Sequence, residues 1–319
     1  MYLMSDKIKS VVNSVNLVGT VVEFEYKTGE TKEEKIPYVS LKGAIQFGDS
    51  KAQARRFERY VQQRSKSKDG KEGKENKLYD KTLAFAKSVV SLAQCKKEDD
   101  KATVVGIQGS LATNDYVNDK DELIESLKID ATFFNDVDEG EAFKGTLDLE
   151  GYIQSVVEET KGEDKVETGR LRVTLLTMDF FGNVIPVKNI IVPKELKEGF
   201  EEAYQTGQTA KFFIDYVVNK APEKPKKTGG LGQQRTTDGK SYVEMILTGA
   251  DPALDEDDEG AISKEAIRIA LAERKSKLAE LKETGYQGSK GKSISSEKRT
   301  GLASGKKKPE PVNDEDIPF

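Results

Sequence analysis

The sequence contains no histidine and only one cysteine, Cys95. Acid–base catalysis by histidine, Cys–His nucleophilic dyads, zinc sites made from His and Cys, and intrachain disulfides are therefore excluded, because the side chains that they need are missing. The many Asp and Glu residues show no spacing that indicates a metal site or a pair of catalytic carboxylates. We therefore expect a protein that is not an enzyme and that uses neither a cofactor nor a metal ion.

Long apolar segments are absent as well. No run approaches the roughly 20 residues that cross a bilayer, and the first residues, Met1 to Lys9, lack the hydrophobic region of a signal peptide. Of the 319 residues, 36% are hydrophobic and 34% are charged, which is polar even for a soluble protein. These features predict a soluble, cytoplasmic protein with modest cores and exposed tails, long enough for two domains.

The charges are separated along the chain. The formal net charge is −5, but residues 51–81 contain eleven basic residues against five acidic ones, whereas acids gather in 251–259 and at the very end. A partner meets a local surface and not the average of the chain. The basic stretch is therefore compatible with a polyanionic partner, although the net charge of the chain is negative.

Alternating apolar residues predict a similar order of elements in two successive blocks of the chain. In the first block, strands are expected at residues 15–26, 36–47, 103–112 and 123–134, with a helix at 78–94. In the second block, strands are expected at 149–157, 170–178, 184–192, 211–218 and 242–248, with a short helix from Pro193 to about Thr206. A weak correspondence links the blocks, because Leu17-Val18-Gly19 and Leu149-Glu150-Gly151 begin comparable strands.

We interpret each block as β-β-β-α-β-β, which is the order of elements in the oligonucleotide-binding (OB) Greek-key barrel, although only two strands are located before the helix of the first block. The fold that we expect is mainly β with helices, as two tandem OB-fold-like barrels at residues 1–139 and 140–250. The alternative is an unspecified pair of α+β domains with antiparallel sheets.

The remainder of the chain changes character twice. Residues 251–284 read as an acidic linker and an amphipathic helix from Ile262 to Glu283, with Ser263 as its N-cap. The narrow apolar stripe of this helix predicts packing on a barrel or self-association through 262–283, with a short coiled coil as the alternative. The Gly, Ser and Lys content of residues 285–319 predicts a disordered tail.

Cations alternate with aromatic rings at the places where a single-stranded nucleic acid could bind. Such a strand needs cations for its phosphates and flat side chains for its bases. The candidates in the first block are Tyr38, Lys42, Arg55, Arg56, Phe57, Arg59, Tyr60 and Arg64. Those in the second block are Tyr152, Arg170 and Arg172. The competing interpretation makes Phe57 and Tyr60 core residues of an amphipathic helix, and the Phe180-Phe181 pair is more typical of a core than of a binding surface.

The last seven residues, Asn313 to Phe319, are acidic and then end in Ile317-Pro318-Phe319. Three adjacent acids are too polar to bury and Pro318 removes a backbone donor, so these residues are typical of a recognition peptide or of an ordinary solvated terminus. The segment resembles the acidic Asp-Ile-Pro-Phe terminus of bacterial single-stranded DNA-binding proteins. The resemblance is limited to this segment. The length and the paired blocks are more similar to a bacteriophage-encoded relative acting in the host cytoplasm.

The resemblance implies a protein that coats single-stranded DNA in replication, recombination and repair. It also implies that Asp314, Glu315, Asp316, Ile317, Pro318 and Phe319 recruit partner enzymes, including enzymes of a host. The alternative function is that of a scaffold that binds a replication enzyme through this segment without binding DNA itself.

Overall fold

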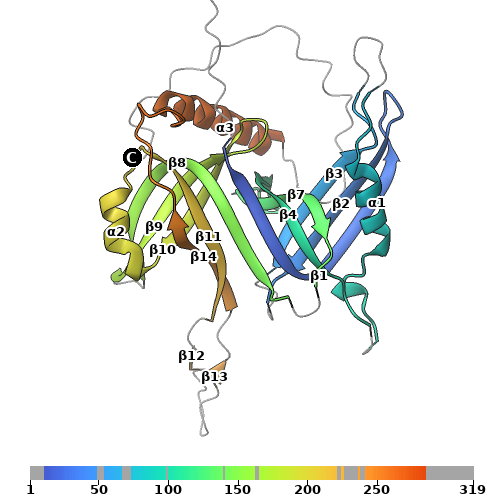
Figure 1. The fold of residues 1–319 in the computed structure, drawn as a ribbon, viewed down its shortest axis with the longest axis horizontal. Coiled ribbons are helices and arrows are strands. Elements are labelled where there is room, and N and C mark those ends of the chain that lie inside the picture. Colours follow the sequence, from blue (N-terminus) through green and yellow to red (C-terminus); the bar gives the residue numbers. More distant parts are fainter. Residues whose placement is uncertain are drawn as a thin grey trace, which may run out of the picture.

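The computed structural model describes residues 11–48, 54–66, 73–97, 100–138, 141–161, 165–220, 224–225, 236–237 and 241–284. Ten long strands form one continuous hydrogen-bonded sheet that curls into two halves lying side by side (Figure 1). The protein is thus mainly β, with three α-helices in the described part of the chain.

The first half is a closed barrel of five strands. Its strands are β1 (Asn13–Glu30), β2 (Pro37–Gln46), β3 (Ala54–Gln62), β4 (Val104–Thr113) and β7 (Leu127–Asn135). They pair in the order β1–β2–β3–β7–β4, and β4 returns to β1; the β3–β7 pair is parallel and the others are antiparallel. This is the strand order of the OB barrel. The strand predicted at 123–134 is interrupted, because β6 (Leu123–Ile124) instead forms a small hairpin with β5 (Tyr116–Val117).

The strands of the second half pair in the same order. They are β8 (Lys144–Lys161), β9 (Val166–Met178), β10 (Val184–Val192), β11 (Thr209–Lys220) and β14 (Ser241–Ala250). The order is β8–β9–β10–β14–β11, and β11 also pairs with β8, with β10–β14 as the parallel pair. Between β11 and β14 the chain forms the two-residue strands β12 (Lys224–Pro225) and β13 (Thr236–Thr237).

Two glycines occupy corresponding positions in the first strands of the two halves. A Cβ atom on Gly19 of β1 would lie 2.2 Å from the carbonyl oxygen of Gln46 in β2. A Cβ atom on Gly151 of β8 would lie 2.5 Å from the carbonyl oxygen of Leu176 in β9. Only a glycine lets the backbones approach this closely. The weak Leu-x-Gly correspondence in the sequence therefore marks the same packing requirement in both halves.

One apolar core runs through both halves. β1 pairs with β8 as well as with its own barrel, with Val15 opposite Leu147. Both side chains are fully buried and belong to a cluster that contains residues of β3, β4, β9 and β11. Burial of apolar surface stabilises the folded state by roughly 25 cal/mol for each Å² that is removed from water. The two halves are therefore joined by sheet hydrogen bonds and by a shared core.

Two short helices close the cores of the two halves (Figure 1). α1 (Leu78–Ser88) packs Tyr79 and Ala86 against a cluster on β2 and β3 of the first barrel, and α2 (Lys197–Ala203), which follows η3 (Lys194–Leu196), buries Phe200 in the core beside the second half. The helix predicted at 78–94 is wrong in its second part, because Val89 is extended. Val90 instead exchanges hydrogen bonds with Thr103 before β4, and a separate 3-10 turn, η2 (Leu92–Gln94), follows Ser91.

The long helix α3 (Lys264–Thr284) lies across the second half and reaches the first (Figure 1). The backbone N–H of Ala266 donates to the Ser263 hydroxyl, which confirms the predicted N-cap. Ile262, Ile267 and Ala270 bury against a cluster that includes Tyr152 and Leu176. Among the described residues, no helix is both long and apolar enough to cross a membrane.

Candidate nucleic-acid interface

A cavity of about 460 Å³ lies between the two halves, and we call it the inter-half groove. Every residue that lines it belongs to a strand. Six lining residues are cationic and two are acidic; the cations are Arg55, Arg56, Lys128, Lys161, Arg172 and Lys188. The acids are Glu159 and Glu244, and the aromatic residues are Tyr216 and Tyr242. The groove thus combines an excess of positive charge with ring surfaces from the second half.

Arg55 connects the halves at the floor of the groove. Its guanidinium carbon lies 4.8 Å from the centre of the Tyr216 ring and 5.8 Å from that of Phe47. Phe47 and Tyr216 stack with centroids 5.5 Å apart. Burial raises the pKa of Tyr216, although the charge of Arg55 acts in the opposite direction. Arg55 is therefore held in place by cation–π contacts with a ring of each half.

Glu159 fixes two arginines on the other side of the groove. Its carboxylate is fully buried, and it accepts hydrogen bonds from Arg170 Nε at 2.7 Å and from Arg172 Nη2 at 3.0 Å. The hydrogen bond from Arg170 is the main cause that lowers the pKa of Glu159 to about 2, against the opposing effect of burial. Arg170 also pairs with Glu244 at 2.8 Å, and of the two arginines it is Arg172 that lines the groove, together with Glu159 and Glu244.

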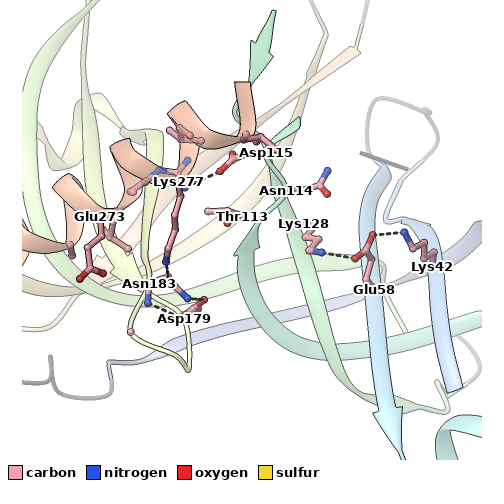
Figure 2. Close-up of a pocket in the computed structure, with 16 residues that line it drawn as sticks. Lys42, Glu58, Thr113, Asn114, Asp115, Lys128, Asp179, Asn183, Glu273 and Lys277 are labelled. Atoms are coloured by element: carbon pink, nitrogen blue, oxygen red, sulfur yellow. Dashed lines mark hydrogen bonds and ion pairs between the residues drawn. The ribbon is translucent and has the colours of Figure 1, made fainter. Parts of the chain in front are cut away.

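A second cavity, of about 450 Å³, shares Lys128 with the inter-half groove (Figure 2). Glu58 pairs there with both Lys128 and Lys42. Burial acts to raise the pKa of Glu58, but these two lysines hold it below its ordinary value. The lining contains four cations and four carboxylates, so the excess of positive charge lies in the inter-half groove and not in this cavity.

The β9–β10 turn presents two phenylalanines at the edge of this second cavity. Phe180 and Phe181 are 94% and 84% exposed, with ring centroids 5.6 Å apart. Asp179 Oδ1 accepts the backbone N–H groups of Phe181 and Asn183, both at 2.8 Å. Figure 2 shows Lys277 of α3 reaching the Asn183 side chain. The turn is therefore fixed, and it holds two apolar rings in solvent, where they are available to a base.

Two predicted aromatic residues meet on the outer face of the first barrel. Tyr38 of β2 and Tyr60 of β3 have ring centroids 5.3 Å apart, and Tyr60 is 52% exposed. Gln62 donates a hydrogen bond to the Tyr60 hydroxyl at 3.0 Å. Lys42 lies further along the same face of the sheet, opposite Glu58. This group is compatible with base stacking next to the second cavity.

Four predicted site residues lie elsewhere. Phe57 is fully buried in the core, and Tyr152 is buried beneath α3, so neither ring can stack on a base and both predictions are wrong. Arg59 lines neither cavity; burial lowers its pKa, with the nearby Asp130 acting in the opposite direction. Arg64 forms a β-bridge with Glu75 beyond the end of β3, away from both cavities. The competing interpretation was right that Phe57 is a core residue but wrong about the amphipathic helix, because Phe57 and Tyr60 lie in strand β3, where Tyr60 is exposed.

Lysines that the sequence did not single out complete the groove: Lys128, Lys161 and Lys188. Each lies on a different strand, and none of them belongs to a stretch in which cations and rings alternate. Successive residues of a strand point to opposite faces, and Lys128 directly precedes the buried Ile129 in β7. This alternation is the signal that could have indicated Lys128 from the sequence. The predicted partner-binding residues, 314–319, lie outside the described part of the chain. Within that part, no group of three or more Cys, Asp or Glu side chains could hold a metal ion.

Comparison with known proteins gives a family and distant structural likenesses. The model of the YorF family matches residues 11–284. No curated protein matches the chain. The wild-type single-stranded DNA-binding protein from Thermus aquaticus is 12% identical, with a TM-score of 0.45 over 78% of this chain and 97% of that one. A deletion mutant of the same protein is also 12% identical, with a TM-score of 0.46 over 78% of this chain and 98% of that one.

A replication protein A heterotrimer bound to single-stranded DNA is 8% identical, with a TM-score of 0.21 over 86% of this chain and 72% of that one. At such identities and TM-scores these likenesses do not show what this chain binds.

Proposed function

The chain belongs to the YorF family, and we propose that it binds single-stranded DNA, without sequence preference, in the inter-half groove. The observation that carries the proposal is the composition of that groove. Six cations face two carboxylates, and both carboxylates are already bound to Arg170. Lys128, Arg172 and Lys188 pair with Glu58, Glu159 and Glu125, whereas Arg56 and Lys161 form no ion pair with another described residue. The lining therefore retains positive charge for phosphates, above all at Arg56 and Lys161.

The shape of the site favours a single strand over a duplex. The groove is lined by strands alone, so it offers no helix of the kind that enters the major groove of B-DNA. Exposed rings lie in the groove, at Tyr242, and beside the second cavity that shares Lys128 with it, at Tyr60 and at the Phe180-Phe181 turn. Unpaired bases can stack on such rings, whereas the bases of a duplex are already stacked on one another.

The finer organisation follows from the strand pairings. We infer that the second half is itself an OB-fold barrel, so that the chain presents two OB folds in tandem with the binding groove between them. The identical strand order and the equivalent positions of Gly19 and Gly151 support this inference. We further propose that the protein acts in DNA replication, recombination or repair in the cytoplasm, that of the host if it is phage-encoded. In this proposal residues 314–319 recruit partner enzymes.

The experiment that tests DNA binding compares a fluorescent oligothymidine with a duplex of equal length across a salt series. We expect tighter binding of the single strand, with log K falling linearly against log salt by about 0.7 for each phosphate that is contacted. Equal affinity for the duplex would contradict the assignment to single strands. If the protein bound neither DNA, the alternative function would be favoured, in which it is a scaffold that recruits an enzyme through residues 314–319.

A further inference from the structure

A third cavity, of about 500 Å³, lies between α3 and the strands beneath it, and we call it the α3 groove. Its apolar lining is formed by Leu123, Pro186, Leu271, Ala272, Leu278 and Ala279. This lining adjoins the face of α3 that buries Ile267 and Ala270 in the second half, and Leu271 belongs to both. The apolar surface of the helix therefore continues past the buried face to the border of an open groove.

A row of cations runs along this groove. Arg268, Lys275 and Lys282 follow one another at intervals of seven residues on α3 and all line the cavity. Neither Lys275 nor Lys282 forms an ion pair with another described residue. Glu125 is the carboxylate among the lining residues, and it is already bound by Arg274 and Lys188. The groove thus suits a ligand that is apolar and negatively charged.

We propose that the α3 groove holds the chain's own segment 313–319. Ile317, Pro318 and Phe319 would occupy the apolar floor, and Asp314 to Asp316 would meet Lys275 and Lys282. The dimensions agree: seven extended residues span about 23 Å at about 3.3 Å each, and the row from Arg268 to Lys282 spans about 21 Å at 1.5 Å per helical residue.

The connecting chain allows this docking within one molecule. α3 ends at Thr284, and residues 285–312 separate it from the segment. At about 3.3 Å per residue they can span roughly 90 Å, several times the length of the groove. A tethered peptide has an effective concentration that reaches the millimolar range. Even a weak contact is therefore populated in the free protein, and it withholds Phe319 from other proteins.

The charges also decide between possible occupants. If two copies of α3 packed face to face through this groove, the row of cations on one copy would face the same row on the other. Like charges brought together without counter-charges repel each other. The segment 313–319 carries three acids and no base. The groove therefore favours the acidic segment over a second copy of the helix.

Zero-length cross-linking of the full chain with a carbodiimide tests the proposal, because this reagent joins carboxylates to lysine amines that touch them. We expect cross-links from residues 314–316 to Lys275 and Lys282, with at least about tenfold higher yield than to Lys81 and Lys87, which are exposed lysines on α1. Phe319→Ser should lower that yield about tenfold, whereas Leu302→Ser, in the connecting residues, should not. Similar yields at all four lysines, or no effect of Phe319→Ser, would overturn the proposal.

Mixing isotopically labelled and unlabelled protein separates docking within a chain from docking between chains. Cross-linked peptides in which both partners carry the same label support docking within one chain. A statistical share of mixed pairs would overturn it in favour of docking between copies. The experiment uses no DNA, so its outcome does not depend on whether the inter-half groove binds a single strand.

Discussion

The guanidinium of Arg55, on β3 of the first barrel, lies 4.8 Å from the centre of the Tyr216 ring, on β11 of the second half. This contact crosses the boundary between the halves and forms part of the floor of the inter-half groove. Arg55 therefore has two roles, because it stabilises the junction and supplies charge to the groove. Its neighbour Arg56 is exposed and lines the same groove, which allows the two roles to be separated.

Arg56→Ala should weaken binding of oligothymidine while leaving the melting temperature unchanged. The salt slope should decrease by about 0.7, because one phosphate contact is lost. Arg55→Ala should reduce the affinity and also the stability, by about 1–2 kcal/mol, since its cation–π contacts are partly desolvated. Binding titrations at several salt concentrations and thermal melts give both quantities. Lys87→Ala, on α1, is the control and should change neither; an unchanged salt slope in Arg56→Ala would remove that residue from the interface.

The exposed rings of Phe180 and Phe181 should contribute to affinity and not to stability. Replacing both by Ala removes base stacking, and each lost base should cost roughly 5- to 150-fold in affinity. The salt slope should stay the same, because no phosphate contact is lost. An oligonucleotide with abasic sites tests the same contact, because it has no bases to stack on these rings. The wild type and the double variant should therefore bind it with equal affinity. Phe143→Ala, at another exposed phenylalanine, is the matched control; an equal loss there would argue against a specific role for the turn.

Glu159 should make stability depend on pH. Its pKa of about 2 in the folded protein is lower than the ordinary value of 4.5, so the ionised form is favoured by folding. This stabilisation is complete above the unfolded pKa and is lost as the pH falls from about 5 towards 2, in total about 3 kcal/mol. Urea unfolding at a series of pH values measures it.

The variant Glu159→Gln isolates the contribution of this carboxylate. It should destabilise the protein at pH 7 by about 3–5 kcal/mol, because two partly buried arginines lose their shared partner. Its stability should also fall less steeply with acid than that of the wild type. Parallel curves for the two proteins would mean that other carboxylates cause the acid sensitivity.

Gly19→Ala and Gly151→Ala should each destabilise the protein by about 2 kcal/mol or more, because the new methyl group would meet a backbone oxygen of the next strand. Gly199→Ala, in α2, is the control. No atom lies within 4 Å of its Cβ position, so this change should be neutral or should stabilise by up to about 1 kcal/mol. Chemical unfolding measures all three variants; a neutral effect at only one of Gly19 and Gly151 would contradict their equivalence.

Local patterns in the sequence predicted much of the fold. The strand expected at 184–192 coincides with β10, and the Ser263 cap precedes α3 as predicted. Alternation succeeds because a half-buried strand must place apolar residues on one face. It also gave the outward positions of Tyr38 and Lys42. It failed at Val89, where the chain becomes extended and the next residue, Val90, pairs with the distant Thr103.

The sequence by itself therefore determined which elements form and which face of each strand is apolar, since those depend on neighbouring residues. Only the tertiary structure decided which outward side chains remain accessible and which of them converge. Tyr152 was expected to face solvent, yet α3 covers it. Arg56 and Arg172 are far apart in the sequence, yet the junction of the two halves brings them into one groove. Both outcomes depend on pairings between distant segments, and these are set by burial over the whole chain rather than by any local pattern.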